Sequence, residues 1–176
     1  MNTVVGRDAA YASNIGSGFG GVVAGYIGGP LAYHIWQQAD WIPFKNNPKV
    51  PIWVCGYGGA DEGTACVTAL QKLGVKPGVV VAADMETRID ETYLMAFWQV
   101  LNRAGYLTLV YGSRSTVFSN PQLNGYWVAD YTGQAHMATN PNTGDTIGVR
   151  GTQWTSGPDF DTSEWKAWVT QQEMWR

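Results

Sequence analysis

The sequence is poor in charge, in cysteine and in histidine. Only 14% of the residues are charged, and the formal net charge is −3. No stretch clusters Lys and Arg, which argues against a nucleic-acid or anionic membrane partner. Two cysteines, Cys55 and Cys66, and two histidines, His34 and His136, are too few for a disulfide framework or a zinc site of four close ligands. We therefore expect buried free thiols, no metal and no cofactor.

Long apolar segments are also missing. No run reaches about 18 consecutive apolar residues, the length that a membrane-spanning helix needs. Residues 1–13 lack the basic segment and apolar run of a signal peptide, so we expect a protein made in the cytoplasm without a membrane span. The sequence gives no motif support for a nucleotide-binding site, because no G-x-x-x-x-G-K-[ST] occurs and no G-x-G-x-x-G follows the first strand and opens a helix.

Aromatic residues and glycine are abundant instead. The 176 residues include nine Trp, nine Tyr and 22 Gly, a length that suits a single domain over residues 1–176. Short β-type runs alternate with two helical patterns, over 61–74 and 89–105, which predicts an α/β fold with a parallel sheet. The predicted strands are residues 3–6, 21–28, 50–57, 78–86, 106–112, 125–131 and 146–154.

The segment 78–86 is apolar until it reaches two acids, Asp84 and Glu86. Such a run suits a strand buried on both faces, in a barrel or in a doubly wound sheet. Residues two apart in a strand share a face, so both carboxyl groups would project into one site at the strand's C-terminal end. Glycoside hydrolases use one protonated and one ionised carboxyl group in the same site. Alternatively, the two acids cap the next helix or pair with Arg88.

Acidic and aromatic residues also stand at the ends of other predicted strands. Asp8 follows the first strand, Asp130 ends the segment 125–131, and Asp161 follows the last predicted strand. Aromatic rings beside carboxylates suit a carbohydrate, because sugar C–H faces stack on rings while hydroxyl groups form hydrogen bonds. Alternatively, Trp127 and some tyrosines fill the core. The candidate substrate-binding residues are Tyr26, Tyr57, Tyr111, Trp127, Asp130, Tyr131 and Trp154.

Four motifs stand in order along the chain: GRDAAYAS (6–13), VVVAADMET (79–87), GYWVADYT (125–132) and GTQWTSGPDFDTSEW (151–165). Together they resemble the motifs of glycoside hydrolase family 25 muramidases and of related glycoside-hydrolase-like domains of actinobacteria and their phages. The resemblance implies an irregular, flattened (β/α) TIM-type barrel of about eight strands with fewer than eight helices. It also implies a retaining hydrolase of the β-1,4 bond between N-acetylmuramic acid and N-acetylglucosamine in bacterial peptidoglycan.

The resemblance also assigns roles by position. Glu86 would be the general acid, and Asp84 would stabilise positive charge at the reacting carbon or orient the substrate's acetamido group. Asp8 and Asp161 would line the same site, and Gln153 would contribute to binding. Whether Asp84 or the acetamido group attacks stays open. The protein would act at the cell wall after release or as part of a virion; a catalytically silent glycan-binding or structural module with the same barrel is the alternative.

Two further segments carry expectations about structure. Residues 11–20 are too few for a full covering helix after the first strand, so the barrel should be trimmed there. The C-terminal residues 163–176 place Trp165, Trp168, Val169 and Trp175 at roughly helical spacing, with Ser163 as a plausible N-cap. This pattern predicts a helix that packs under the barrel floor or offers an exposed wall-binding or subunit contact. The oligomeric state stays open.

Overall fold

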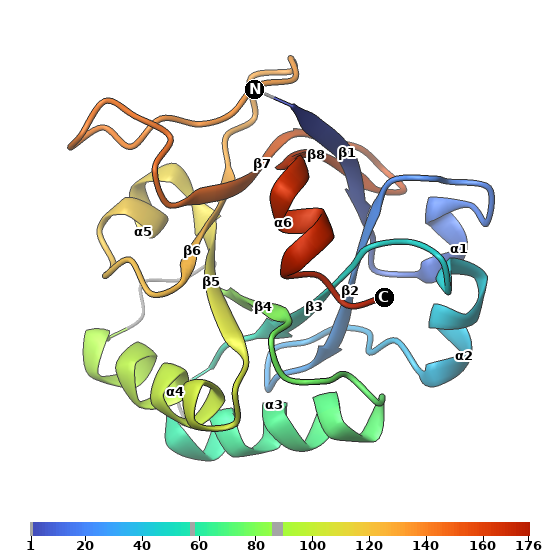
Figure 1. Ribbon diagram of the computed structural model, residues 1–176, viewed down its shortest axis with the longest axis horizontal. Coiled ribbons are helices and arrows are strands. Elements are labelled where there is room, and N and C mark those ends of the chain that lie inside the picture. Colours follow the sequence, from blue (N-terminus) through green and yellow to red (C-terminus); the bar gives the residue numbers. More distant parts are fainter. Residues whose placement is uncertain (1, 57–58, 86–89) are drawn as a thin grey trace.

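Eight strands close into a barrel in the computed structural model, which describes residues 2–56, 59–85 and 90–176 (Figure 1). The strands follow one another around the barrel in chain order. This confirms the predicted α/β class and the irregular barrel of eight strands. The strands are β1 (Thr3–Asp8), β2 (Val22–Gly28), β3 (Lys49–Val54), β4 (Val80–Asp84), β5 (Leu107–Ser113), β6 (Gly125–Ala129), β7 (Val149–Ser156) and β8 (Asp161–Lys166).

Helices cover the barrel unevenly. The two long ones, α3 (Ala60–Lys72) and α4 (Glu91–Arg103), confirm the two helical patterns, and the Asp90 side chain caps α4 by accepting a hydrogen bond from the Thr92 amide. Only short helices follow β1 and β2, and after β1 this confirms the trimming expected from residues 11–20. The described residues contain six α-helices in all, the others being α1 (Ala12–Ile15), α2 (Gln38–Trp41), α5 (Arg114–Phe118) and α6 (Ala167–Gln172), with a 3-10 helix η1 (Ile42–Phe44) after α2.

The last strand corrects two predictions. β8 runs antiparallel to both β7 and β1, so the sheet is mixed and not wholly parallel. The helix expected from Ser163 begins only at Ala167, because Ser163 and Trp165 belong to β8. Gly6 and Gly151 on the neighbouring strands make room for the Trp165 indole: a Cβ atom on Gly6 would lie 2.5 Å from it, and one on Gly151 would lie 2.8 Å from it.

The period of two in β4 divides its side chains between two cores. Val80 and Ala82 point into the barrel, where they join Trp127 and Trp165. Val81 and Ala83 point outward, into the layer that the helices cover. This division explains why the strand is apolar on both faces. It also means that Asp84, two residues after Ala82, points into the barrel.

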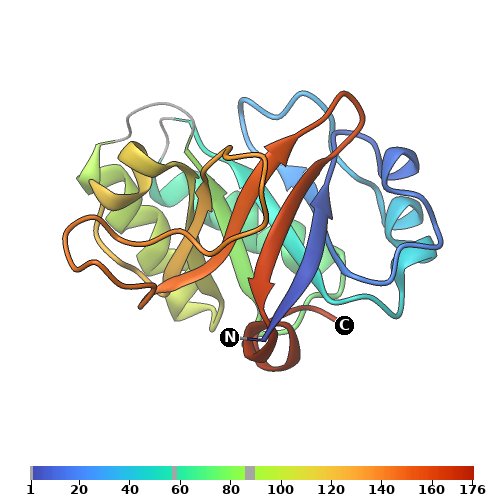
Figure 2. The same cartoon turned by 90° about the horizontal axis from the view of Figure 1, so that it is seen from above.

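The amino-terminal end of the barrel is closed by α6. Val169 of α6 and Met174 after it pack against the interior cluster, which is the floor packing expected of this segment. Figures 1 and 2 show α6 across this end, with both chain termini beside it. Trp168 remains 39% exposed. The Arg150 guanidinium carbon lies over the Trp168 ring, 4.5 Å from the ring centre. Among the described residues, no helix is long and apolar enough to cross a membrane.

The two cysteines are free and buried, as the sequence predicts. Burial raises the pKa of both thiols, Cys55 and Cys66. A thiol needs its thiolate form to react as a nucleophile. These side chains therefore belong to the packing of the fold.

Candidate functional site

Three aspartates meet at the carboxyl-terminal mouth of the barrel. Asp8 is the last residue of β1, and Asp84 is the last residue of β4. Asp84 faces inward because it continues the alternation of Val80 and Ala82. Asp161 is the first residue of β8, and the antiparallel direction of that strand brings it to the same mouth, in register with Asp8. Asp8 and Asp84 are each only 3% exposed.

The Gln153 side chain joins two of these acids to two tyrosines. Its amide nitrogen donates to Asp161 Oδ2 at 2.6 Å and, more weakly, to the two Asp8 carboxyl oxygens at 3.4 and 3.5 Å. Its amide oxygen accepts from the Tyr111 hydroxyl at 2.5 Å and from the Tyr131 hydroxyl at 3.1 Å. Both ends of a fully buried amide are therefore used, which fixes its orientation.

The environment of Asp8 favours its protonated form. Burial is the main cause that raises the pKa of Asp8 well above its ordinary value, and the negative charges of Asp161 and Asp84 raise it further. A hydrogen bond with its own backbone acts in the opposite direction. Close carboxyl groups in a dry site cannot all be ionised at low cost. Burial and the neighbouring carboxylates therefore both favour the protonated form of Asp8.

We expect Asp8→Asn to stabilise the protein at neutral pH by at least about 1 kcal/mol, since each unit of pKa shift corresponds to about 1.4 kcal/mol. The folded pKa of Asp8 lies above its unfolded value. The free energy of unfolding that the Asp8 proton contributes is therefore fully present below the unfolded pKa, about 3.9. This contribution is lost as the pH rises toward the folded pKa. Asparagine carries no such proton and still accepts a hydrogen bond from Gln153.

The measurement is urea unfolding of both proteins from pH 3 to pH 8. The difference in the free energy of unfolding between Asp8→Asn and the parent should increase with rising pH and vanish near pH 3. Asp159→Asn, at an exposed aspartate between β7 and β8, serves as the control with the same chemical change. A gap that does not vary with pH would contradict the argument.

Two of the predicted aromatic residues lie below the mouth. Tyr111 of β5 is 5% exposed and reaches the cluster only through its hydroxyl group. Trp127 of β6 has no exposed surface: its ring packs 4.4 Å from that of Tyr111, and its indole nitrogen donates to Ser163 Oγ. The prediction that Trp127 binds substrate is therefore corrected. It fills the barrel, because β6 directs it inward one layer below the acids.

A pocket of about 200 Å³ opens beside Asp84. Tyr26 of β2, one of the candidate binding residues, forms one wall. The loop after β2 adds Leu31, Tyr33 and His34, which the sequence analysis did not select. The Tyr33 side chain is 92% exposed at this position. An exposed ring on a loop has no periodic signal in the sequence, and only its place beside an acid reveals it.

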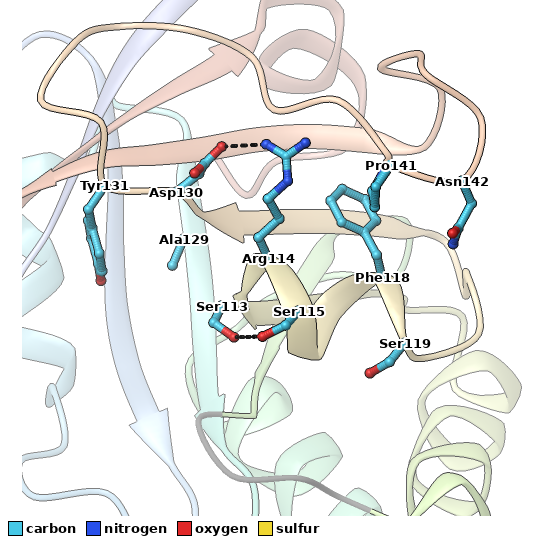
Figure 3. A pocket seen from close by; sticks show the side chains of 10 residues that line it. All are labelled: Ser113, Arg114, Ser115, Phe118, Ser119, Ala129, Asp130, Tyr131, Pro141 and Asn142. Carbon is cyan, nitrogen blue, oxygen red and sulfur yellow. Dashed lines mark hydrogen bonds and ion pairs between the residues drawn. The ribbon is translucent and has the colours of Figure 1, made fainter.

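The remaining candidates are placed as follows. Asp130 lies just after β6, where its carboxylate pairs with Arg114 and faces a neighbouring cavity (Figure 3). Tyr131 is 57% exposed between that cavity and Gln153. The Trp154 side chain is half-buried, and its buried indole N–H has no hydrogen-bond partner among the described residues. Glu86 and Tyr57 lie outside the described residues.

The strand beside Asp84 is braced from outside the barrel. The Glu62 carboxylate of α3 accepts hydrogen bonds from the Tyr93 hydroxyl at 2.5 Å and from the Gly56 amide at 2.9 Å. The residue before Gly56 bonds directly to the end of β4: the Cys55 amide donates to the Asp84 carbonyl at 2.9 Å. The backbone at Asp84 is thereby tied to the helical layer.

No protein-family model matches the chain, and neither does any curated protein. Solved structures do match. An uncharacterized protein of B. stearothermophilus superposes with a TM-score of 0.73 at 17% identity, over 94% of this chain and 97% of that one. At this level of sequence identity, the match shows a shared fold and nothing finer.

Two cell-wall lysins share the same fold. The modular autolysin LytC of Streptococcus pneumoniae, in complex with a synthetic peptidoglycan ligand, matches with a TM-score of 0.68 at 15% identity. The modular Cpl-1 endolysin of phage Cp-1, complexed with a peptidoglycan analogue, matches with a TM-score of 0.60 at 15% identity. These matches cover 94% and 92% of this chain, which spans about half the length of each lysin, 47% and 53%.

Proposed function

We propose that the protein is a retaining glycoside hydrolase that cleaves the β-1,4 bonds of bacterial peptidoglycan, acting at the cell wall after release or as part of a virion. The observation that carries the proposal is the cluster of Asp8, Asp84 and Asp161 at the mouth of the barrel. Similarity of fold to LytC and Cpl-1, both solved with peptidoglycan ligands or analogues, supports the same substrate class.

The geometry suits the charge that develops in glycoside cleavage. The transition state carries positive charge at the reacting sugar carbon, and a carboxylate close to that carbon stabilises it. Asp84 faces the pocket and supplies this carboxylate or orients the acetamido group. The surroundings of Asp8 raise its pKa and favour its protonated form, which lessens the repulsion between the carboxyl groups at the mouth. Protonation of the leaving oxygen falls to Glu86, in the role that the resemblance implies.

Digestion of purified actinobacterial cell walls tests the proposal. Release of new reducing ends, without release of new amino groups, identifies cleavage of glycosidic bonds. Proton NMR of the first product distinguishes the retained β-anomer from the inverted α-anomer. Absence of reducing ends at high protein concentration, with walls still bound in a pull-down, would replace the hydrolase with the glycan-binding alternative.

Tyr33→Ala should raise KM for wall fragments about two- to tenfold and leave kcat nearly unchanged. The ring is almost fully exposed beside the Asp84 pocket, so its contact with a sugar face would be equal in the ground state and the transition state. Aromatic contacts of this kind are worth about 0.5–1.5 kcal/mol. Tyr33→Phe keeps the ring and should behave like the parent. A loss of kcat in Tyr33→Ala would contradict a purely binding role.

A further inference from the structure

The side chain of Arg7 lies over two aromatic rings on the outside of the barrel. Gly6 and Asp8 face the interior, so Arg7 between them on β1 faces outward. Its guanidinium carbon is 4.1 Å from the centre of the Phe160 ring and 4.5 Å from that of the Phe19 ring. A cation is attracted to the face of an aromatic ring. Arg7 therefore connects the turn between β7 and β8, which contains Phe160, to the segment between α1 and β2, which contains Phe19.

The guanidinium of Arg7 has few polar partners. Nη1 donates to the Ile15 carbonyl, at the end of α1, at 3.2 Å. Nε is buried and has no hydrogen-bond partner among the described residues, and none of the ion pairs formed by those residues involves Arg7. A buried polar atom without a partner costs stability, so an apolar side chain could fill this place at a lower cost. What the guanidinium adds is a directed contact with the rings.

The turn that Arg7 contacts carries Asp161. Phe160 directly precedes Asp161, the first residue of β8. Both carboxyl oxygens of Asp161 are engaged: the Gly157 amide donates to Oδ1 at 3.2 Å, and the Gln153 amide nitrogen donates to Oδ2 at 2.6 Å. A Cβ atom on Gly157 would lie 2.8 Å from the Phe160 carbonyl oxygen, so the turn is tightly closed. The position of the turn therefore sets the orientation of the Asp161 carboxylate.

Helix α1 supplies a second contact with the same turn. Asn14 Nδ2 donates to the Asp159 carbonyl at 3.1 Å. Figures 1 and 2 both show the turn next to α1, beyond the end of β1. The hydrogen bond of Asn14 is exposed, so water competes with it. The half-buried side chain of Arg7 is the better shielded of the two contacts.

We propose that Arg7 is a positioning residue for the acid cluster: by holding the turn of residues 157–160 against β1, it fixes the Asp161 carboxylate at the mouth. The inference rests on the proposed function only for its effect on turnover. Asp161 lies in register with Asp8, and its negative charge raises the pKa of Asp8. Loss of the contact with Phe160 would let Asp161 move away from Asp8. The titration of Asp8 therefore reports the position of Asp161.

Three variants test the proposal. Arg7→Leu removes the cation, whereas Arg7→Lys keeps it. Arg150→Leu is the matched control, because Arg150 also lies over a ring, that of Trp168, at the opposite end of the barrel. Thermal unfolding of each variant checks that it is folded.

Two of the measurements need no enzymatic activity. NMR of the aspartate side chains follows the titration of Asp8, whose other titratable neighbours, Asp84 and Tyr111, are left unchanged by these substitutions. Chymotrypsin cleavage after Phe160, located by mass spectrometry, follows the opening of the turn. The third measurement is the kinetics of wall digestion, which separates kcat from KM.

Arg7→Leu should shift the titration of Asp8 to lower pH. Cleavage after Phe160 should become about two- to thirtyfold faster, the change that corresponds to loss of a cation–π contact of about 0.5–2 kcal/mol. In wall digestion, kcat should fall by up to about 100-fold, the effect of a misplacement of about 1 Å, while KM stays within about twofold. Arg7→Lys should lie between Arg7→Leu and the parent, and Arg150→Leu should change neither the titration nor the cleavage.

An unshifted titration of Asp8 in folded Arg7→Leu, or the same shift in Arg150→Leu, would overturn the proposal. If Arg7→Leu does not fold, Arg7→Lys decides by the same criteria. Wall digestion by the parent together with an unshifted titration rejects only the role of Arg7. A shifted titration in a protein that does not digest walls rejects only the hydrolase.

Discussion

Asp84→Asn should lower the rate of peptidoglycan hydrolysis by about 10²–10³-fold, which is the range for loss of one group that stabilises transition-state charge. The substitution keeps the size of a side chain that is 3% exposed, so the fold should be retained. It also removes one of the charges that raise the pKa of Asp8, which should slightly stabilise the protein at neutral pH. The measurement is the rate of reducing-end release from cell walls.

Glu86→Gln should produce a loss of about 10²–10⁴-fold in the same assay, because an amide cannot protonate the leaving oxygen. The controls are Asp159→Asn and Glu91→Gln, which make the same chemical changes at exposed positions that do not belong to the acid cluster. Wall digestion at the parental rate by Asp84→Asn and Glu86→Gln would remove both residues from the mechanism. Equal losses in the controls would point to a general effect of charge on wall binding.

Gln153→Met should lower the free energy of unfolding by about 2–6 kcal/mol, because each of the two buried polar groups that lose a partner costs about 1–3 kcal/mol. The Tyr111 hydroxyl and the Asp8 carboxyl group would remain buried, whereas Asp161 and Tyr131 can turn to water. For a domain of this length, each kcal/mol shifts the melting temperature by about 2–4 °C. Thermal and urea unfolding give the two readings.

Gln153→Glu separates the charge of this residue from its shape. It keeps the acceptor for Tyr111 but places a carboxyl oxygen where an amide nitrogen now lies 2.6 Å from Asp161. Repulsion raises the pKa of the clustered carboxyl groups, so the deficit should grow as the pH rises from 4 to 8. The Met variant changes no charge, and its deficit should vary less with pH. The same pH dependence in both variants would contradict the role given to the amide nitrogen.

Local patterns in the sequence predict most of the barrel. The alternation from Val80 to Asp84 places one residue set inside and one outside, and acidic first turns with glycine after the last turn mark the two long helices. The antiparallel β8 escaped prediction because Trp165, Trp168 and Val169 also fit a helical period. Strand direction depends on the connection and on the fit of Trp165 against Gly6 and Gly151, neither of which is local.

The candidate site was predictable where its residues end strands. Asp8 and Asp84 each end a strand that the sequence pattern predicts, whereas Asp161 follows a predicted strand but in fact begins β8. The part that Gln153 plays could not be derived from spacing, because its partners Asp8 and Asp161 meet only after the barrel closes. Tyr33 was missed because an exposed loop residue carries no pattern.

The pairing of β1 with β8 makes closure of the barrel a late step in folding. Thr3 lies opposite Lys166, so the first strand obtains its second neighbour only from β8, the last strand of the barrel. Contacts of such long sequence separation form slowly, since the loop entropy must be overcome before they stabilise anything. During synthesis on the ribosome, β1 therefore keeps one unpaired edge until the end of β8 has emerged. The aspartates of β1 and β8 face each other only at that last step, so the chemistry of the mouth is assembled by closure itself.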